Sequence, residues 1–161
     1  MLQMPCEKRR SENCMIKVQA SILINTTAED IFVAMIDTKR HRELVYNYVD
    51  QYDGPEFLSA GSYFHWRMRL YGLTRRVHSL VSAFDPPRQY QETIRINGFM
   101  KAVLTKTLEA EKGGTLLTWT WEYIPAFGTL GKIVDRIIGG QRTALRGVEE
   151  SLKMIKAAME S

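Results

Sequence analysis

A sheet face of large apolar side chains is the feature that most constrains the fold of this 161-residue chain. In two segments, 61–70 and 115–123, apolar residues alternate with residues that are mostly polar or charged. The apolar positions are Phe64, Trp66, Met68 and Leu70 in the first segment, and Leu117, Trp119, Trp121 and Tyr123 in the second. This period of two predicts β-strands of a sheet with one buried and one solvent-facing side. The buried side has to be covered by another element.

Turn sequences divide the segment from 45 to 125 into several strands. They are Asp53-Gly54-Pro55, Gly72, Asp85-Pro86-Pro87-Arg88, Asn97-Gly98 and Lys112-Gly113-Gly114. Turns at this spacing predict an antiparallel meander. One more strand is expected to begin at Met15 or Ile16, where apolar residues alternate as far as Ile24.

Two short helices are predicted between that first strand and the meander. Thr27 is a suitable N-cap, and Glu29 and Asp30 place negative charge in the first turn of the helix that follows. Asp37 is expected to end this helix, and a second short helix is expected from Thr38 to about Leu44.

The period becomes helical again from Gly128 to the end of the chain. Gly139-Gly140 lies inside this stretch, and because each glycine costs a helix roughly 1 kcal/mol, a kink or a break is expected there. A lone amphipathic helix can cover the sheet only if the sheet curls around it. The residues predicted to form the apolar stripe are Leu130, Val134, Ile137, Ile138, Gln141, Leu145, Val148, Leu152, Ile155 and Met159.

Several short segments also occur in a distinctive order. They are Ile24-Asn25-Thr26-Thr27-Ala28-Glu29-Asp30-Ile31-Phe32, Gly54 and Gly61, Asp85-Pro86-Pro87, and Gly113-Gly114-Thr115-Leu116-Leu117-Thr118-Trp119. Over approximately residues 16–160 the chain resembles the START-like (SRPBCC) superfamily, which includes polyketide cyclases/dehydratases, lipid-transfer domains and coenzyme-Q-binding proteins. The resemblance implies an α+β helix-grip fold: a curved seven-stranded antiparallel β-sheet wrapped around a long C-terminal α-helix, with two short helices after the first strand.

The resemblance further implies that the gap between the sheet and the C-terminal helix is a ligand cavity. Such pockets are mostly apolar, with a few polar groups that orient the ligand. Plain core packing is the alternative role for the same side chains, because cavity wall and core are one surface in such a domain. The candidate ligand-binding residues are Phe64, Trp66, Met68, Val77, Ile94, Leu117, Trp119, Trp121, Val134, Ile137 and Ile138.

Glu92 is the ionisable residue expected on the buried side of the sheet. In the segment QYQETIRI it shares the face of the strand that carries the apolar residues Tyr90, Ile94 and Ile96. Burial disfavours a charged carboxylate, which would suit Glu92 to act as a general acid or base, with Arg75 on the neighbouring strand as its partner. A structural ion pair, or an edge position open to water, is the alternative.

The histidines and cysteines predict no metal site. His41 lies in the polar second helix, and His65 and His78 fall on the solvent-facing side of their strands, so all three are expected at the surface. No group of His, Cys, Asp or Glu has the spacing of metal ligands, and no metal or other cofactor is expected.

Four arginines gather around the turn at Tyr71-Gly72, namely Arg67, Arg69, Arg75 and Arg76. Contacts with phospholipid headgroups or nucleic acid are one interpretation. A solvated hairpin end is favoured, because no aromatic platform alternates with the arginines on the same face.

The chain has 22 Lys and Arg against 18 Asp and Glu, and this net charge of +4 does not indicate a nucleic-acid-binding protein. At most transient contact with a membrane is expected.

The segment Phe127-Gly128-Thr129-Leu130-Gly131 joins the last strand to the long helix. A lid over the mouth of the cavity and a hydrophobic staple at a helix start are both compatible with it.

Residues 1–14 are charged and aperiodic, which predicts a flexible leader before a START-like ligand-binding domain over 15–161. Cys6 and Cys14 are expected to be ordinary thiols in a reducing compartment. The leader has no apolar stretch after its basic residues, and no apolar run approaches the roughly 20 residues needed to span a bilayer. A cytoplasmic location is therefore expected.

The sequence supports three functions. The first is binding or transport of a small hydrophobic ligand, such as a lipid, a quinone or a polyketide-like aromatic, in the cavity. The second is a polyketide cyclase/dehydratase-type enzyme that uses the same cavity. The third is a protein-interaction module with a filled core.

Overall fold

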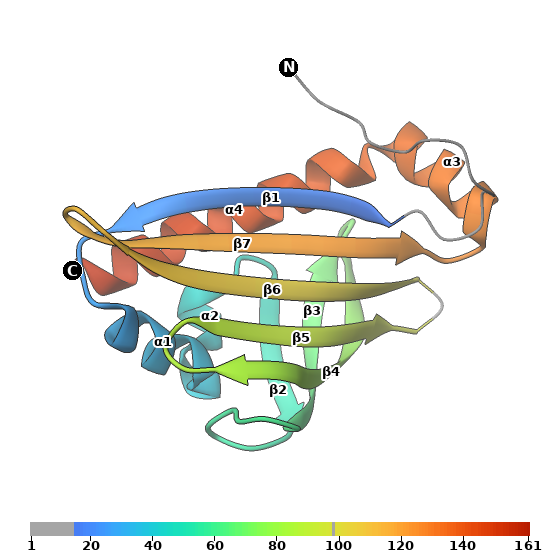
Figure 1. Ribbon diagram of the computed structural model, residues 1–161. Helices are drawn as coiled ribbons and strands as arrows, with labels where there is room; N and C mark the ends of the chain where they lie inside the picture. Colours follow the sequence, from blue (N-terminus) through green and yellow to red (C-terminus); the bar gives the residue numbers. More distant parts are fainter. Residues whose placement is uncertain (1–14, 98) are drawn as a thin grey trace.

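One curved antiparallel sheet organises the computed structural model, which describes residues 15–97 and 99–161. The predicted leader, residues 1–14, lies outside the described residues. The strands follow the order β1-β7-β6-β5-β4-β3-β2, so the last strand of the chain pairs with the first (Figure 1). They are β1 (Ile16–Ile24), β2 (Tyr48–Asp53), β3 (Tyr63–Leu70), β4 (Leu73–Asp85), β5 (Gln89–Ile96), β6 (Met100–Glu111) and β7 (Gly114–Pro125).

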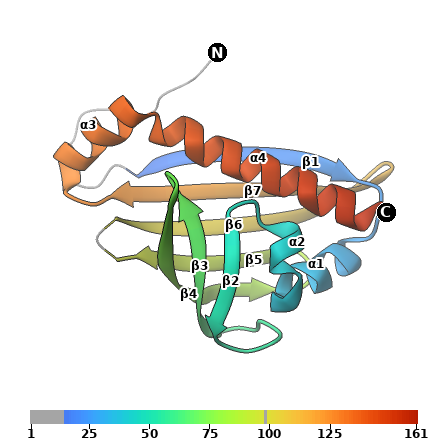
Figure 2. The ribbon, with the colours of Figure 1, turned by 180° about the vertical axis from the view of Figure 1, so that it is seen from behind.

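The helices lie where the sequence predicts them. They are α1 (Ala28–Ile36), the 3-10 helix η1 (Thr38–Arg40), α2 (His41–Leu44), α3 (Gly128–Ile138) and α4 (Gly140–Met159). The Thr27 hydroxyl accepts a hydrogen bond of 3.2 Å from the Asp30 backbone N–H, so the predicted N-cap is confirmed. The α+β helix-grip architecture is likewise confirmed: the sheet wraps around α4, which crosses its concave side (Figure 2).

Hydrogen bonds fix the C-terminal half of α4 in this position. The Lys156 ammonium donates to the Leu23 carbonyl at 2.6 Å, and the Glu160 carboxylate accepts from the Asn25 backbone N–H at 2.8 Å. On the other side of the helix, the Ser151 hydroxyl accepts from the Tyr46 backbone N–H at 3.0 Å. Together with the burial of Val148, Leu152 and Ile155, these bonds hold α4 over the sheet.

The predicted break is present between α3 and α4. Gly139 ends α3 with φ of 71°, a left-handed conformation in which glycine has no steric penalty. Asp135, in the last turn of α3, accepts a 2.9 Å hydrogen bond from the Tyr123 hydroxyl. Its carboxylate lies against Gly140, where an added Cβ would meet Oδ1 at 1.9 Å. The end of α3, the start of α4 and the end of β7 are thus joined at one point.

The prediction of one continuous apolar stripe is wrong for α3. Leu130, Val134, Ile137 and Ile138 are exposed, whereas Gly131 and Asp135 are buried. The turn at Gly139 changes the direction of the chain, so the two helices present different faces to the sheet. Gly131 also packs on the Ala126 carbonyl, with no room for a side chain.

The prediction that His41 lies at the surface is wrong as well, because its imidazole is 5% exposed. Its Nε2 donates to the Met35 carbonyl at 3.1 Å, and the ring meets Tyr48 edge-on with 5.7 Å between centroids. Burial and the positive charge of Lys106 lower the pKa of His41 from 6.5 to about 4. This histidine is a neutral core residue that joins α2 to α1.

We predict that Gly140→Ala and Gly147→Ala change stability in opposite directions. A methyl group at 140 displaces the Asp135 carboxylate and breaks its bond with Tyr123, which lowers the free energy of unfolding by about 1–3 kcal/mol. A methyl group at 147 makes an ordinary contact with Asn47 at 3.7 Å. Through the higher helix propensity of alanine it raises the free energy of unfolding by roughly 0.5–1 kcal/mol. Urea denaturation of both variants measures this, and equal effects would contradict the arrangement at Gly140.

We predict that protonation of His41 destabilises the protein in acid. Since its pKa falls from 6.5 to about 4 on folding, the unfolded chain binds the proton first as the pH drops. The free energy of unfolding then falls by about 3 kcal/mol between about pH 6.5 and about pH 4. When His41→Gln is denatured across this pH range, its free energy of unfolding is expected not to show this decrease. The free energy of unfolding of His65→Gln, a change at an outward-facing histidine, is expected to decrease as it does in the natural chain. A full loss in His41→Gln would refute the assignment.

Candidate functional site

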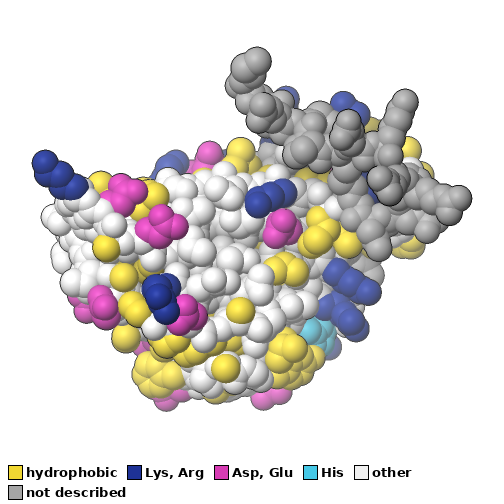
Figure 3. Space-filling model, in the orientation of Figure 1, with side chains coloured by type: hydrophobic (Ala, Val, Ile, Leu, Met, Phe, Trp, Pro, Cys, Tyr) yellow, Lys and Arg dark blue, Asp and Glu magenta, His cyan; other side chains and the backbone are white. Residues whose placement is uncertain are grey.

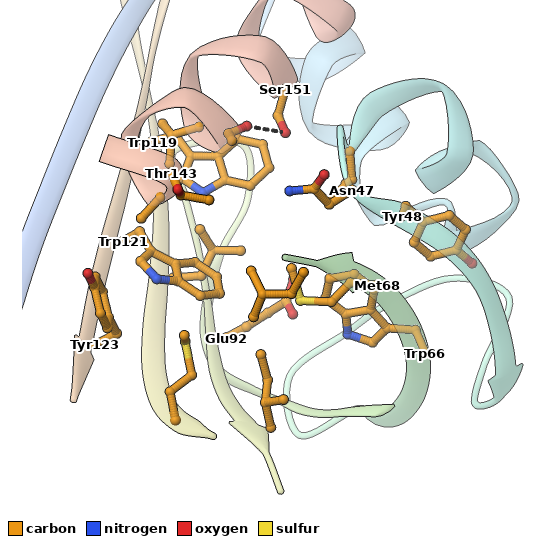
Figure 4. A pocket seen from close by; sticks show the side chains of 18 of the residues that line it. Asn47, Tyr48, Trp66, Met68, Glu92, Trp119, Trp121, Tyr123, Thr143 and Ser151 are labelled. Carbon is orange, nitrogen blue, oxygen red and sulfur yellow. Dashed lines mark hydrogen bonds between the residues drawn. The ribbon is translucent and has the colours of Figure 1, made fainter. Parts of the chain in front are cut away.

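A cavity of about 90 Å³ lies between the concave face of the sheet and α4. This volume is several times the roughly 15 Å³ that one water molecule requires. Figure 4 shows Trp119 and Trp121 of β7 with Thr143 of α4 on one side, Trp66 and Met68 of β3 on the other, and Ser151 of α4 above them. The walls are predominantly aromatic and aliphatic, as in sites that enclose apolar ligands.

The structure divides the predicted ligand-binding residues into three groups. Phe64, Trp66, Met68, Trp119 and Trp121 line the cavity. Val77, Ile94 and Leu117 are buried in the sheet core without lining it. Val134, Ile137 and Ile138 lie outside it on the exposed side of α3, because the helix break turns that side away from the sheet.

Glu92 lies on the inner face of β5, as its alternation predicts, and lines the cavity while 4% exposed. Its Oε1 accepts a 2.6 Å hydrogen bond from the Tyr90 hydroxyl. Burial, together with the charge of Glu92, raises the pKa of Tyr90 well above its usual value, so this phenol stays a donor.

Arg75 is not the partner of Glu92. Glu92 pairs across the sheet with Val81, and Arg75 lies six residues before Val81 on β4, about 20 Å along the strand. The Arg75 guanidinium lies instead over the Phe99 ring, 5.8 Å from its centroid. The predicted pairing is therefore wrong, because sharing a face of the sheet does not put two residues at the same level of it.

Lys106 of β6 is the cation close to Glu92. It is 3% exposed, lines the cavity, and lies opposite Tyr90 in the register of β5 and β6. Its ammonium lies 4.3 Å from the Trp119 ring centroid and 5.2 Å from that of Tyr90. Burial lowers the pKa of Lys106, and the charge of Glu92 opposes this effect. The signal in the sequence was the alternation of Ala102, Leu104, Lys106 and Leu108, which places the lysine on the buried face.

A second polar group lies at the other end of the cavity, near the α3–α4 break. It comprises the bonded pair Tyr123 and Asp135, with Tyr71 and Thr143 beside them in the lining. Burial and the Asp135 carboxylate raise the pKa of Tyr123, so its hydroxyl remains the donor to Asp135. Tyr71 is 41% exposed and marks where the lining approaches solvent.

This arrangement can hold an apolar molecule and orient its polar group. The Lys106 ammonium is a donor, the Glu92 carboxylate an acceptor, and the neutral imidazole of His41 lines the same cavity.

Within residues 15–97 and 99–161, no three His, Cys, Asp or Glu side chains gather as metal ligands would. None of the helices described has the length and apolar character needed to cross a bilayer.

Solved structures with the same fold share little sequence with this chain. Protein CV1439 from Chromobacterium violaceum is 15% identical with a TM-score of 0.71, covering 90% of this chain and 98% of that one. Protein SA2116 from Staphylococcus aureus, of unknown function, is 13% identical with a TM-score of 0.70, covering 94% and 97%. The di-domain ARO/CYC StfQ from the steffimycin biosynthetic pathway is 10% identical with a TM-score of 0.73, covering 91% of this chain and 51% of StfQ.

A search of curated proteins found no match. The sequence of residues 15–160 does match a family model described as polyketide cyclase / dehydrase and lipid transport. This match covers nearly all of the residues that form the sheet, the helices and the cavity between them. The chain therefore belongs to the polyketide cyclase / dehydrase and lipid transport family.

Proposed function

We infer that the protein binds a small hydrophobic molecule with a polar oxygen group in the cavity beneath α4. The observation that carries this inference is the presence of Lys106 and Glu92, both buried, in the wall of an otherwise aromatic cavity. Burying charged groups costs several kcal/mol unless other groups compensate them. Tyr90 supplies one hydrogen bond to Glu92, whereas the partners of the Lys106 ammonium among the described residues are two aromatic faces.

The pair favours a ligand with a hydroxyl, phenol or enol group. The oxygen of such a group can accept from Lys106 while its hydrogen is donated to Glu92. The body of the ligand would contact Trp66, Trp119 and Trp121, and burial of apolar surface would supply affinity at roughly 25 cal/mol per Å² before the cost of binding. A lipid, a quinol or a polyketide-like aromatic fits this description.

The direct test is native mass spectrometry of freshly purified protein, followed by solvent extraction of what it releases. A stoichiometric apolar molecule with such a group supports the proposal. A protein that is empty, and also fails to bind a panel of these molecules, favours an interaction module instead.

We predict that a bulky side chain in the cavity abolishes binding. Ala144→Trp fills the space from α4, whereas Ala157→Trp places the same side chain on the exposed side of the same helix. Titration with the apolar fluorescent dye N-phenyl-1-naphthylamine is expected to show at least about tenfold weaker binding for Ala144→Trp, because overpacking excludes the dye. Ala157→Trp is expected to bind like the natural chain. Equal binding by both variants would place the dye elsewhere.

An enzyme of the cyclase/dehydratase type is the second candidate. The hydrogen bond from Tyr90 to Glu92, with Lys106 nearby, is a short path for moving a proton next to a bound substrate. StfQ, which is similar in fold, is a di-domain ARO/CYC from the steffimycin biosynthetic pathway. A cavity that holds a flexible chain in a folded shape also accelerates ring closure by proximity alone.

We predict that Glu92→Gln impairs the second candidate function. If the protein is an enzyme, turnover of a synthetic poly-β-keto thioester falls by about 10²–10⁴-fold, as expected for loss of a general acid or base. Glu122→Gln on the outer face of β7 is the matched control and is expected to keep full activity. Unchanged turnover in Glu92→Gln would exclude Glu92 as the proton-transfer group.

A further inference from the structure

The amphipathic helix α3 has its apolar side toward solvent. Gly131 and Asp135 face the domain, and the opposite side carries what we call the α3 face. Its members are Phe127, Leu130, Ile133, Val134, Ile137 and Ile138, with Phe127 81% and Ile137 78% exposed. A surface helix ordinarily buries its apolar side against its own domain. Contiguous exposed apolar surface of this kind indicates a site of interaction with another surface.

Phe127 adds an independent observation. Its φ of 67° lies in the left-handed region, which is unfavourable for a bulky residue, and it is the N-cap of α3. Strained backbone of this kind is concentrated at functional positions. Here it presents a phenyl ring to solvent at the start of the α3 face.

Two hairpins lie at the same end of the molecule as α3. The β3–β4 turn and the start of β6 meet where the Tyr71 and Phe99 rings lie 5.9 Å apart. The Ala126 backbone N–H, just before α3, donates to the Phe99 carbonyl at 2.7 Å. Figure 1 shows α3 beyond the end of the sheet where β7 stops and β6 begins.

The charges at this end are almost all positive. Segments 67–76 and 95–101 contain no acidic residue, and within 126–146 the acidic residue is Asp135, which is buried against Tyr123. Figure 3 shows Lys and Arg side chains beside hydrophobic ones at the end of the molecule where the β5–β6 hairpin lies. The exposed basic residues are Arg69, Arg76, Arg95, Lys101, Arg136 and Arg142.

We propose that the α3 face docks on the surface of a membrane that contains anionic phospholipid, with the surrounding basic residues against the headgroups. Helices with an apolar side and basic flanks bind in the plane of such an interface. A symmetric contact between two copies would bring the same basic residues together, and their repulsion opposes it. The lining residues Tyr71 and Asp135 lie at this end, so the docked surface would adjoin the cavity.

Co-sedimentation with lipid vesicles tests the proposal on the full chain. Binding is expected to vesicles of phosphatidylglycerol and phosphatidylcholine, and to be much weaker with phosphatidylcholine alone. Leu130→Ser with Ile137→Ser is expected to weaken binding at least about tenfold, because both side chains would enter the interface. Arg136→Gln is expected to weaken it about fivefold, the equivalent of roughly 1 kcal/mol for one basic residue near an anionic surface.

Val33→Ser is the matched control, since Val33 is a 57% exposed apolar residue of α1, distant from the α3 face. It is expected to bind vesicles like the natural chain. Ala144→Trp is also expected to keep vesicle binding, which separates this proposal from ligand binding in the cavity.

Two results would overturn the proposal. One is absence of binding of the natural chain to the phosphatidylglycerol vesicles. The other is sedimentation velocity that shows an oligomer which Leu130→Ser with Ile137→Ser converts to a monomer, because a second copy would then cover the α3 face.

Discussion

The apolar concave side of the sheet has to be kept from water by one helix, and the rest of the structure depends on how α4 does this. The sheet curves around that helix. The hydrogen bond that Lys156 donates to the Leu23 carbonyl, and the one that Ser151 accepts from the Tyr46 backbone N–H, hold its C-terminal half in place. A helix is narrower than the curved surface that it covers. The cavity between Trp119, Trp66 and α4 is therefore a consequence of the architecture, and side-chain chemistry decides what the space can hold.

The N-terminal end of α4 is held in a different way. Asp135 accepts a hydrogen bond from Tyr123 and lies against Gly140, so the end of β7, the last turn of α3 and the first turn of α4 share one contact. The same contact sets the orientation of α3, because Asp135 faces the domain and the apolar residues on the opposite side then face solvent. One buried polar pair thus determines both a wall of the cavity and the exposure of the α3 face.

Much of the fold could be predicted from the sequence because burial follows the period of the strands. Alternation placed Phe64, Trp119 and Glu92 on the buried face, and the glycine pair located the helix break. The direction of α3, the helix that precedes this break, could not be predicted, since it depends on the contact of Asp135 with Tyr123, residues that no periodicity connects. The burial of His41 also depends on tertiary packing, in which α2 lies against α1 and β2. Lys106 shares the alternation of Leu104 and Leu108, which predicts a buried position, whereas the charge of a lysine ordinarily predicts an exposed one.

Lys106 and the α3 face depart from ordinary residue placement in opposite directions. One is a cation inside the apolar interior, and the other is an apolar helix side exposed to water. Neither increases the stability of the isolated chain, since burial of an ammonium and exposure of apolar surface both cost free energy. Natural proteins keep such departures mainly where function requires them. Because the Lys106 group and the α3–α4 break border one cavity, both departures are consistent with a protein that takes an apolar molecule from a surface and holds it by its polar group.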